Sequence, residues 1–417
     1  MKKYVFFTPC ICKVGGAEEY VNKKSSRLEN AGYTPIIFHC VNGPILIPHF
    51  NEVRNYRIIE LGLTPFYYTK KQRHRIIEQI IKYCDIGRND EVLIESTEIS
   101  MCEWGEMVAE QIGAKHVCII LQENHNYPAY FQEYLFYKYN RSELYGITKN
   151  SISMMLKDYD SALLDGRYIV AECNNVVDDV PCALLEHIPK ADYTIGSIGR
   201  LEKNFVIDGL KQVILLANKH QGCSFNIILI GSGSDERINE IKKMFEQVTN
   251  VTLLITGYMY PIPVKLLERI DCFFSSAGSV HVTSKLGKPT ISMAADGDPI
   301  GIMNYTTINS LYKDEPYVKT ELSNYLEMIL MEHYCQVHIP IRKESPKVDY
   351  GQEFNRQMGF FAQNIKQAYY PIEDKYVLSS RGKIYRLCAS VLGSRLFVRL
   401  LSALECYKMK FKQKGNR

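Results

Sequence analysis

The sequence predicts an α/β protein built from two doubly wound, parallel-sheet domains of similar size. At 417 residues, the chain is too long for one ordinary core. Apolar strand-like runs alternate with helix-like segments along most of its length, as in parallel α/β domains. The sequence of strand, glycine turn and helix also begins twice, at the N-terminus and again near residue 195. Two such beginnings predict two nucleotide-binding folds that face each other across a central cleft.

The first domain is expected to begin with a buried strand at residues 4–7, followed by the glycine turn Gly15-Gly16. A helix over residues 18–30 should follow and stop at Ala31-Gly32. The next expected strands are 35–38, 91–95 and 116–121, and the next expected helices are 71–83 and 104–113. Strands separated by helices of this length form a parallel, doubly wound sheet.

The second domain is expected to start near Tyr193, after a linker at 181–189 that begins and ends with proline. Its apolar strands are predicted at 195–198, 227–230, 251–255, 271–274 and 289–291. Residues 351–371 should form a helix that packs back on the first domain. The predicted division is therefore 1–180, 190–345, a returning helix within 346–372, and a basic helical tail at 373–417.

Charge is distributed unevenly along the chain. Residues 375–417 contain eleven Lys or Arg and one acidic residue, Glu405. This tail therefore has a net charge of +10, whereas the net charge of the whole chain is +4. The remainder carries −6 (4 − 10), which argues against a nucleic-acid-binding body. Apolar runs alternate with basic residues in the tail, as in a basic amphipathic helix on an anionic membrane. The alternative is a solvated, charged end that docks on the body.

Other global features favour a cytoplasmic location. The sequence has no run of eighteen or more apolar residues, so no transmembrane helix is expected. The N-terminal apolar run is too short for a signal peptide and lacks a cleavage pattern. The thirteen cysteines are scattered and only Cys10 and Cys12 form a close pair, which favours reduced thiols over disulfides or a zinc site.

The glycine turns carry the chemical prediction. Gly15 and Gly16 allow close backbone approach, and the helix after them directs its positive end to the cleft. Arg200 and Lys203 follow a strand end, where two cations would stabilise a departing pyrophosphate. The alternative for Gly15-Gly16 is a tight turn with a structural role only. The alternative for Arg200 and Lys203 is a pair of cations on a surface loop. No Asp-x-Asp motif occurs where a metal-dependent transferase needs one, so no metal and no cofactor are expected.

These motifs together resemble glycosyltransferase family four. Residues 15–18 resemble its Gly-Gly-x-Glu entry, residues 199–203 resemble its Gly-Arg-Leu-(x)-Glu-Lys element, and Gly231 and Gly233 match the glycine turn that follows. The resemblance covers roughly residues 1–310. It implies the GT-B fold and a nucleotide-sugar donor bound mainly by the second domain. It also implies that Arg200 and Lys203 hold the diphosphate while Gly15-Gly16 closes on it.

One element departs from that family. Two glutamates are expected before the final Gly-x-Pro, yet residues 273–289 contain no carboxylate. This segment is similar to the Ser-x-Ala-Gly and Leu-Gly-Lys-Pro elements of the peptidoglycan N-acetylglucosaminyltransferases. Hydrogen bonds to the donor nucleotide or sugar would then come from polar groups here, at Ser276, Gly278, Ser279, Thr283 and Ser284.

For catalysis, His125 is the first candidate and Glu123 its competitor, because both follow a strand end on the acceptor side. In an inverting enzyme either would deprotonate the acceptor hydroxyl; in a retaining one it would contact the donor sugar. Local hydrogen bonding within a loop is the alternative. An aromatic patch after Tyr127 would accept a lipid or sugar ring, or would pack as an ordinary tyrosine-rich helix.

The predicted function is a metal-independent hexosyltransferase at the cytoplasmic membrane face. It would move a sugar from a nucleotide diphosphate donor to a lipid-linked or saccharide acceptor, as in capsule or surface polysaccharide assembly. A non-catalytic GT-B partner subunit and a nucleotide-sugar epimerase are the alternatives. A nicotinamide dehydrogenase is disfavoured, because no third glycine follows Gly231 and Gly233.

Overall fold

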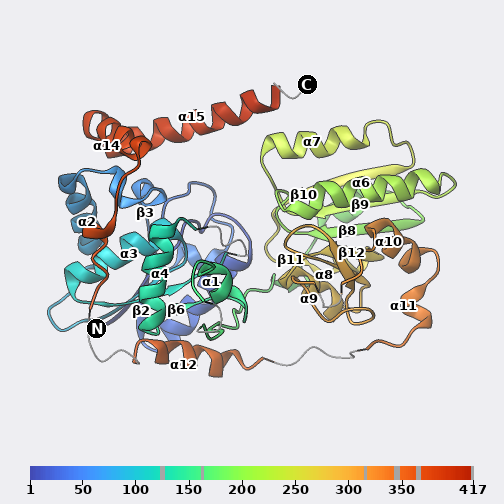
Figure 1. Ribbon diagram of the computed structural model, residues 1–417. Helices are drawn as coiled ribbons and strands as arrows, with labels where there is room; N and C mark the ends of the chain where they lie inside the picture. The colour runs from blue at the N-terminus through green and yellow to red at the C-terminus, as the bar shows by residue number, and fades with distance from the viewer. Residues whose placement is uncertain (123–126, 161–163, 314–316, 342–347, 363–367, 415–417) are drawn as a thin grey trace. The chain divides into compact units, whose positions relative to one another are not determined.

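The computed structural model describes residues 1–122, 127–160, 164–313, 317–341, 348–362 and 368–414, with side chains described as far as residue 404. The chain forms two compact units (Figure 1). Unit 1 comprises Met1–Lys13, Tyr20–Ala171 and Asp349–Arg417, and unit 2 comprises Val14–Glu19 and Glu172–Val348. Each unit is built on one six-stranded sheet, so the predicted α/β architecture with two Rossmann-like domains is confirmed.

Unit 1 contains a wholly parallel sheet with the strand order β3-β2-β1-β4-β5-β6. Its strands are β1 (Lys2–Phe7), β2 (Tyr33–His39), β3 (Arg54–Arg57), β4 (Glu91–Ser96), β5 (Lys115–Ile119) and β6 (Leu144–Tyr145). Its helices are α1 (Gly16–Asn30), α2 (Lys70–Cys84), α3 (Ile99–Ile112), α4 (Ala129–Asn140) and α5 (Ser151–Met155). Helix α1 begins in the segment that groups with unit 2.

Local sequence signals explain these elements. The strand residues Val5, Phe38 and Ile94 are completely buried and pack with Trp104 of α3 in one apolar core. Thr69 begins α2 through a capping box with Gln72, which satisfies two backbone donors that would otherwise lack partners. The predicted strands 4–7, 35–38 and 91–95 lie inside β1, β2 and β4.

Unit 2 contains a sheet with the order β10-β9-β8-β12-β13-β14, which is parallel except for β14. Its strands are β8 (Tyr193–Ile198), β9 (Phe225–Ile230), β10 (Val251–Gly257), β12 (Cys272–Ser275), β13 (Thr290–Met293) and β14 (Pro299–Ile302). The helices are α6 (Asn204–Lys219), α7 (Asp235–Phe245), α8 (Val264–Glu268), α9 (Gly278–Lys285), α10 (Leu322–Leu330) and α11 (Tyr334–Val337). Two short strands, β7 (Val177–Asp178) and β11 (Ile262–Pro263), pair separately.

The C-terminal segment returns to unit 1. It forms α12 (Tyr350–Phe360), α13 (Ile372–Lys375), α14 (Ser380–Leu392) and α15 (Ser394–Lys414). Contacts with distant parts of the unit hold α12 in place, since Tyr20 donates to Gln357 at 3.1 Å and Val170 N donates to Glu353 at 3.1 Å. Among the described residues, no helix combines the length and apolar character that a membrane span requires.

Candidate functional site

The strand order of unit 2 places a topological switch point between β8 and β12. The chain leaves β8 toward β9 on one side of the sheet and leaves β12 toward β13 on the other. In open α/β sheets, ligands bind at the carboxyl ends of the two strands where the order reverses. The segments that begin there are 199–203 and 276–278, and both contain residues of the predicted donor site. The fold therefore brings these two sequence motifs to one edge of one sheet.

Two glycines interlock the loops after β8 and β9. Gly231 has a φ of +149°, and a Cβ added to it would lie 1.9 Å from the carbonyl oxygen of Gly199. Gly199 N donates to the Ile230 carbonyl at 3.0 Å, and Leu201 N donates to the Ser232 carbonyl at 3.1 Å. No side chain fits between backbones this close, so glycine is required at position 231 for a steric reason.

Glu202 fixes the same pair of loops. Its Oε1 accepts a hydrogen bond from Ser234 N at 2.7 Å, and a Cβ on Gly233 would lie 3.1 Å from this oxygen. Ser234 in turn caps α7 by accepting from Arg237 N at 3.2 Å. The carboxylate of Glu202 thus positions the glycine turn, a role that the motif alone did not indicate.

The two predicted diphosphate cations differ in their surroundings. Arg200 is exposed, and its side chain forms no hydrogen bond or ion pair with another residue that the structure describes. Lys203 is partly buried and is the N-cap residue of α6, with no side-chain cap on that helix. The guanidinium of Arg200 therefore remains available to an anion at this edge of the sheet.

Helix α9 begins directly at the switch point. Ser275 ties β12 to β8 by accepting a hydrogen bond from Ile198 N at 3.1 Å. Ala277 precedes the helix with a positive φ of 56° and a ψ of −130°, and no side chain caps α9. First-turn amide groups without a side-chain cap, combined with the helix dipole, favour a negatively charged ligand.

An asparagine pair missed by the sequence analysis lies against this helix. A Cβ on Gly278 would approach Asn174 Oδ1 to 3.2 Å, and Ser279 Oγ donates to Asn175 Oδ1 at 3.2 Å. The only signal in the sequence is a repeated asparagine just before the short strand β7. The amide groups of this pair add further donors and acceptors beside the start of α9.

The remaining predicted donor contacts differ in accessibility. Thr283 is completely buried, accepts from Thr290 Oγ1 at 2.8 Å and donates to the Ser279 carbonyl at 3.1 Å. Ser284 donates back to the His281 carbonyl at 3.3 Å, and Ser276 is buried. The Thr283 hydroxyl is therefore engaged inside the unit, because helix α9 directs it toward β13 and not toward the strand ends.

The N-terminal glycine turn lies beside the same asparagine segment. Gly16 is the first residue of α1, and a Cβ on it would lie 3.5 Å from Cys173 Cβ. Both residues belong to unit 2, since Val14–Glu19 groups with that unit. Gly15 is followed closely by Glu18, whose Oε2 would meet a Cβ there at 2.9 Å. The candidates Glu123 and His125 lie outside the described residues.

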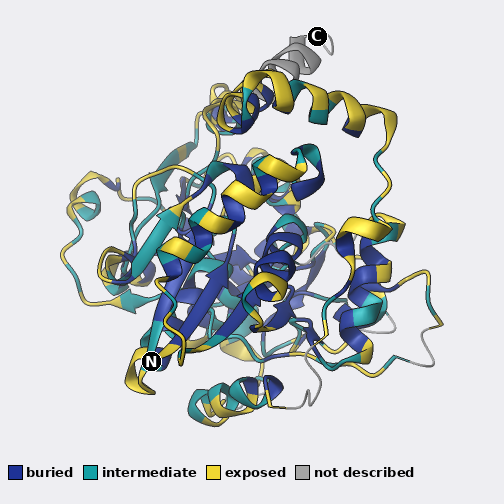
Figure 2. Cartoon of the chain, turned by 90° about the vertical axis from the view of Figure 1, so that its left-hand side faces the viewer, coloured by how far each residue is buried: buried dark blue, intermediate teal, exposed yellow. Residues whose placement is uncertain are grey.

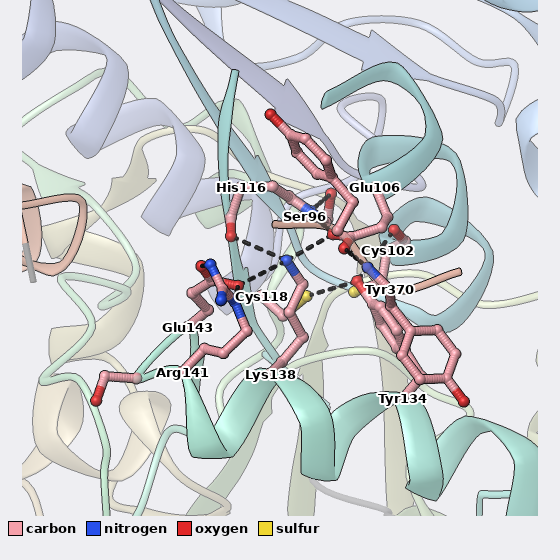
Figure 3. Close-up of polar contacts among 12 residues, drawn as sticks. Ser96, Cys102, Glu106, His116, Cys118, Tyr134, Lys138, Arg141, Glu143 and Tyr370 are labelled. Carbon is pink, nitrogen blue, oxygen red and sulfur yellow. Dashed lines mark hydrogen bonds and ion pairs between the residues drawn. The ribbon is translucent and has the colours of Figure 1, made fainter. Parts of the chain in front are cut away.

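Unit 1 contains a buried polar cluster that sequence reasoning also missed (Figure 3). His116 contacts Glu106 Oε2 through Nδ1 at 2.6 Å and Ser96 Oγ through Nε2 at 2.9 Å. Lys138 forms ion pairs with Glu106 at 2.5 Å and with Glu143 at 3.0 Å. Burial and the nearby Lys138 lower the pKa of His116. Burial opposes the charge of Glu106, yet Lys138 and His116 lower its pKa to about 2.

The serine, histidine and glutamate of this cluster have the arrangement of a hydrolytic triad, but their burial argues against that role. Ser96 is 0% exposed, and a Cβ on Gly105 would lie 2.2 Å from its hydroxyl oxygen. A substrate would have no path to a nucleophile that a helix backbone covers this closely. The cluster stabilises the junction of β4, β5 and α3.

The aromatic patch after Tyr127 proves to be mainly core. Phe131, Tyr134 and Tyr139 of α4 are buried and belong to one apolar cluster with Tyr127. Tyrosine-rich helix packing, the simpler of the two alternatives, explains these side chains. Within the described residues, no group of three or more His, Cys, Asp or Glu side chains is arranged to hold a metal ion.

Comparisons with known proteins agree with this architecture. No family model and no curated protein matches the chain. Among solved structures, it is similar to a glycosyltransferase from Rickettsia africae ESF-5, with a TM-score of 0.53, 12% identity, and coverage of 88% of this chain and 99% of that chain. It is also similar to a putative UDP-N-acetylglucosamine 2-epimerase from Listeria monocytogenes, with a TM-score of 0.51, 12% identity, and coverage of 88% and 98%.

A third similar structure is TarM, with a TM-score of 0.50, 12% identity, and coverage of 90% of this chain and 97% of that chain. At this level of identity the comparisons establish the fold alone. The chain has the GT-B fold, which confirms the fold class predicted from its motifs.

Proposed function

We propose that the protein is a glycosyltransferase that uses a nucleotide diphosphate-sugar as its donor. The observation that carries the proposal is the switch point of unit 2, where interlocked glycine loops, Arg200 and the start of α9 converge at the ends of β8 and β12. The likeness to a GT-B glycosyltransferase supports it. The donor chemistry is a diphosphate whose negative charge grows as the sugar bond breaks.

The residues of unit 2 supply what such a leaving group requires. Backbone N–H groups at the starts of α6 and α9 lack side-chain caps and would donate to phosphate oxygens. Arg200 and Lys203 would add positive charge, and its attraction to the diphosphate would grow as the leaving group forms. These groups neutralise a diphosphate without a metal ion, so the proposed reaction is metal-independent.

Polar groups at α9 would replace the absent donor-site glutamates. Residues 273–289 contain no carboxylate, but Ser276, Gly278, Ser279 and Ser284 offer hydroxyl or backbone groups there. The amides of Asn174 and Asn175 lie against the same helix start and extend this set. Neutral donors of this kind would bind ribose or sugar hydroxyls by hydrogen bonds alone.

For the transfer step, the sequence-based candidates His125 and Glu123 stand as the proposed general base or sugar contact. The proposed acceptor is a lipid-linked or free saccharide, with a role in capsule or surface polysaccharide assembly, and the proposed class is hexosyltransferase. These assignments rest on the motif resemblance described above.

An epimerase is the second candidate, because the Listeria protein of similar fold is named as a putative UDP-N-acetylglucosamine 2-epimerase. The two activities differ in their requirement for an acceptor. An epimerase converts its nucleotide-sugar when no acceptor is present, whereas a transferase releases nucleoside diphosphate and extends an acceptor. A non-catalytic partner subunit would bind the nucleotide and do neither.

Thermal unfolding with UDP, GDP, CDP, ADP and NAD tests the donor site. A ligand at one hundred times its dissociation constant should stabilise the protein by about 2.7 kcal/mol. We expect one nucleoside diphosphate to stabilise the wild type and to lose this effect in Arg200→Ala. Arg269→Ala is the matched control, since Arg269 is also an exposed arginine of unit 2. Stabilisation by NAD alone would overturn the proposal.

Turnover of radiolabelled sugar donors that carry the nucleotide identified by the first screen then separates the candidates. Removal of a general base should lower transfer by at least about a hundredfold in His125→Ala while nucleotide stabilisation persists. Conversion of the donor to an epimer without acceptor would identify an epimerase. Nucleotide binding without either reaction would identify a partner subunit.

A further inference from the structure

Helices α14 and α15 dock on unit 1 through one face only. Ala389, Phe397, Val398 and Leu401 are buried in the core of that unit. Gln72 Nε2 of α2 donates to the Ala389 carbonyl of α14 at 2.7 Å, and this hydrogen bond ties α2 to α14. The tail is therefore a fixed part of unit 1, and its other face is set at a defined place on the surface.

The outer face of α14 is apolar. Ile384, Leu387 and Val391 are 59%, 65% and 76% exposed, and their spacing of three and four residues places them on one side of the helix. The buried residues Gly382 and Ala389 lie on the opposite side. Figure 2 shows exposed residues recurring along the helices next to the C-terminus.

Exposed apolar residues are concentrated in this part of the chain. Of the nineteen large apolar side chains that are exposed among the described residues, eight lie within residues 377–404. These eight are Val377, Ile384, Leu387, Val391, Leu392, Leu396, Leu400 and Leu404. A concentration of this kind marks an interaction surface, because scattered single residues would need no explanation.

The charge that residues 376–404 themselves carry beside this apolar face has one sign. Residues 376–404 contain five basic residues and no acidic one. Arg381 and Lys383 lie on the two sides of the α14 stripe, while Arg395 and Arg399 accompany the exposed leucines of α15. The partner of this surface must therefore be both apolar and anionic.

A cavity of about 550 Å³ opens beside the stripe. It is lined by Thr69, Tyr376, Val377, Leu378, Lys383, Arg386, Leu387 and Ser390. Arg386 uses Nε to donate to the Phe66 carbonyl at 3.0 Å, and its other nitrogens donate to no residue that the structure describes. Burial and the nearby Arg73 lower the pKa of Arg386, and Glu373 offsets this effect only in part, so an anion in the cavity would stabilise the guanidinium charge.

We propose that unit 1 docks on an anionic lipid bilayer through the outer face of α14, with the phosphate of a lipid headgroup in the cavity between Lys383 and Arg386. The apolar stripe would enter the boundary between headgroups and acyl chains, as in helices that lie in the plane of a membrane. The flanking cations would contact phosphates on both sides. This inference depends on unit 1 alone and is independent of the proposed nucleotide chemistry.

Flotation of the full-length protein with lipid vesicles tests the surface. Vesicles of phosphatidylcholine alone are compared with vesicles containing one third phosphatidylglycerol. We expect binding to the anionic vesicles only, weakened by added salt. The triple variant Ile384→Ser, Leu387→Ser and Val391→Ser should lose at least about tenfold in vesicle affinity. Lys383→Gln should lose about fivefold.

Matched controls come from unit 2. The triple variant Leu215→Ser, Val337→Ser and Ile339→Ser removes apolar residues that are 57%, 70% and 83% exposed. Lys211→Gln removes a lysine charge of unit 2 whose side chain is 62% exposed. Both should bind anionic vesicles as the wild type does. All variants should keep the wild-type nucleotide response, so failure here and failure of the proposed function are distinguishable.

Three results would overturn the inference. The first is a wild-type protein that does not float with anionic vesicles. The second is wild-type affinity in the α14 triple variant. The third is light scattering that shows a dimer of the wild type and a monomer of the triple variant, because the stripe would then be covered by a second copy of the chain.

Discussion

The two sheets share one strand order but differ in the chemistry of their interiors. In unit 1, β4 carries Glu95, which is 0% exposed and contacts Tyr4 and Lys24 at 2.5 Å each. In unit 2, the equivalent strand β12 carries Phe273 and Phe274. Within residues 172–348, every buried polar side chain that the structure describes is uncharged. Topology thus decides where the strand ends meet, and side chains decide what the interior tolerates.

This difference predicts two kinds of fragility. Unit 1 depends on buried charge pairs, so it should respond to loss of a partner and to pH. Unit 2 depends on close backbone packing at its glycine loops, so it should respond to added atoms. The single tryptophan, Trp104, is buried in unit 1 and provides a fluorescence signal for that unit.

The largest expected effect is the loss of a buried cation in unit 1. Lys138→Met leaves the carboxylates of Glu106 and Glu143 buried without their ammonium partner, which should cost about 3–5 kcal/mol. Urea unfolding followed by Trp104 fluorescence measures it. Lys375→Met is the control, because its pair with Glu133 is exposed on both sides and should matter by less than about 1 kcal/mol. Equal effects would show that burial does not set the cost.

The steric counterpart in unit 2 is Gly231→Ala. The added methyl would meet the Gly199 carbonyl oxygen at 1.9 Å, so the loops must separate, at a cost of about 3 kcal/mol. Nucleotide stabilisation should disappear while the Trp104 transition stays in place. In Gly222→Ala the new methyl meets nothing within 4 Å, and both signals should remain as in the wild type. A normal nucleotide response in Gly231→Ala would contradict the interlocked-loop interpretation.

A third effect is the pH dependence of unit 1 at Glu103. Burial raises the pKa of Glu103 to about 8, although nearby hydroxyls of Thr64 and Tyr130 favour its charged form. Because the pKa of Glu103 is higher in the folded than in the unfolded state, the stability contributed by its bound proton is complete at low pH and is lost as pH rises through about 8. Glu103→Gln should therefore gain at least about 1 kcal/mol over the wild type between about pH 5 and about pH 8. Parallel pH profiles in urea unfolding would contradict this.

Most strands were predictable from the sequence, because a buried parallel strand is a continuous apolar run. Edges were harder. Strand β3 consists of Arg54–Arg57, a polar edge strand without that pattern. The predicted strand 116–121 extends two residues past β5, whose end at Ile119 is set by pairing and not by hydrophobicity. The predicted helix at 104–113 lacks the first turn of α3, since no capping side chain marks its start.

The candidate site was predictable where a glycine or the end of an apolar strand carried the signal, as at Gly231 and Arg200. Gly231 is required by a backbone contact, and its place after an apolar strand already indicated a loop. Glu106 and Lys138 look like surface charges on helices, and only tertiary packing buries them together. Thr283 looks like a hydrogen-bond donor to a ligand until the orientation of α9 shows that its hydroxyl contacts Thr290 of β13. Pairings between distant segments are the information that a single sequence does not contain.

The smallest expected effect concerns backbone strain at the candidate site. Ala277 holds a positive φ of 56° before α9, a conformation that costs a residue with a Cβ about 1–2 kcal/mol. Ala277→Gly should therefore stabilise unit 2 by about 1 kcal/mol in thermal unfolding. Asp85→Gly, at the left-handed end of α2 in unit 1, should gain less, since aspartate tolerates that conformation. If Ala277→Gly is stabilised but binds nucleotide more weakly, the strain serves to fix the helix start for the ligand; unchanged affinity would show that α9 is held by packing alone.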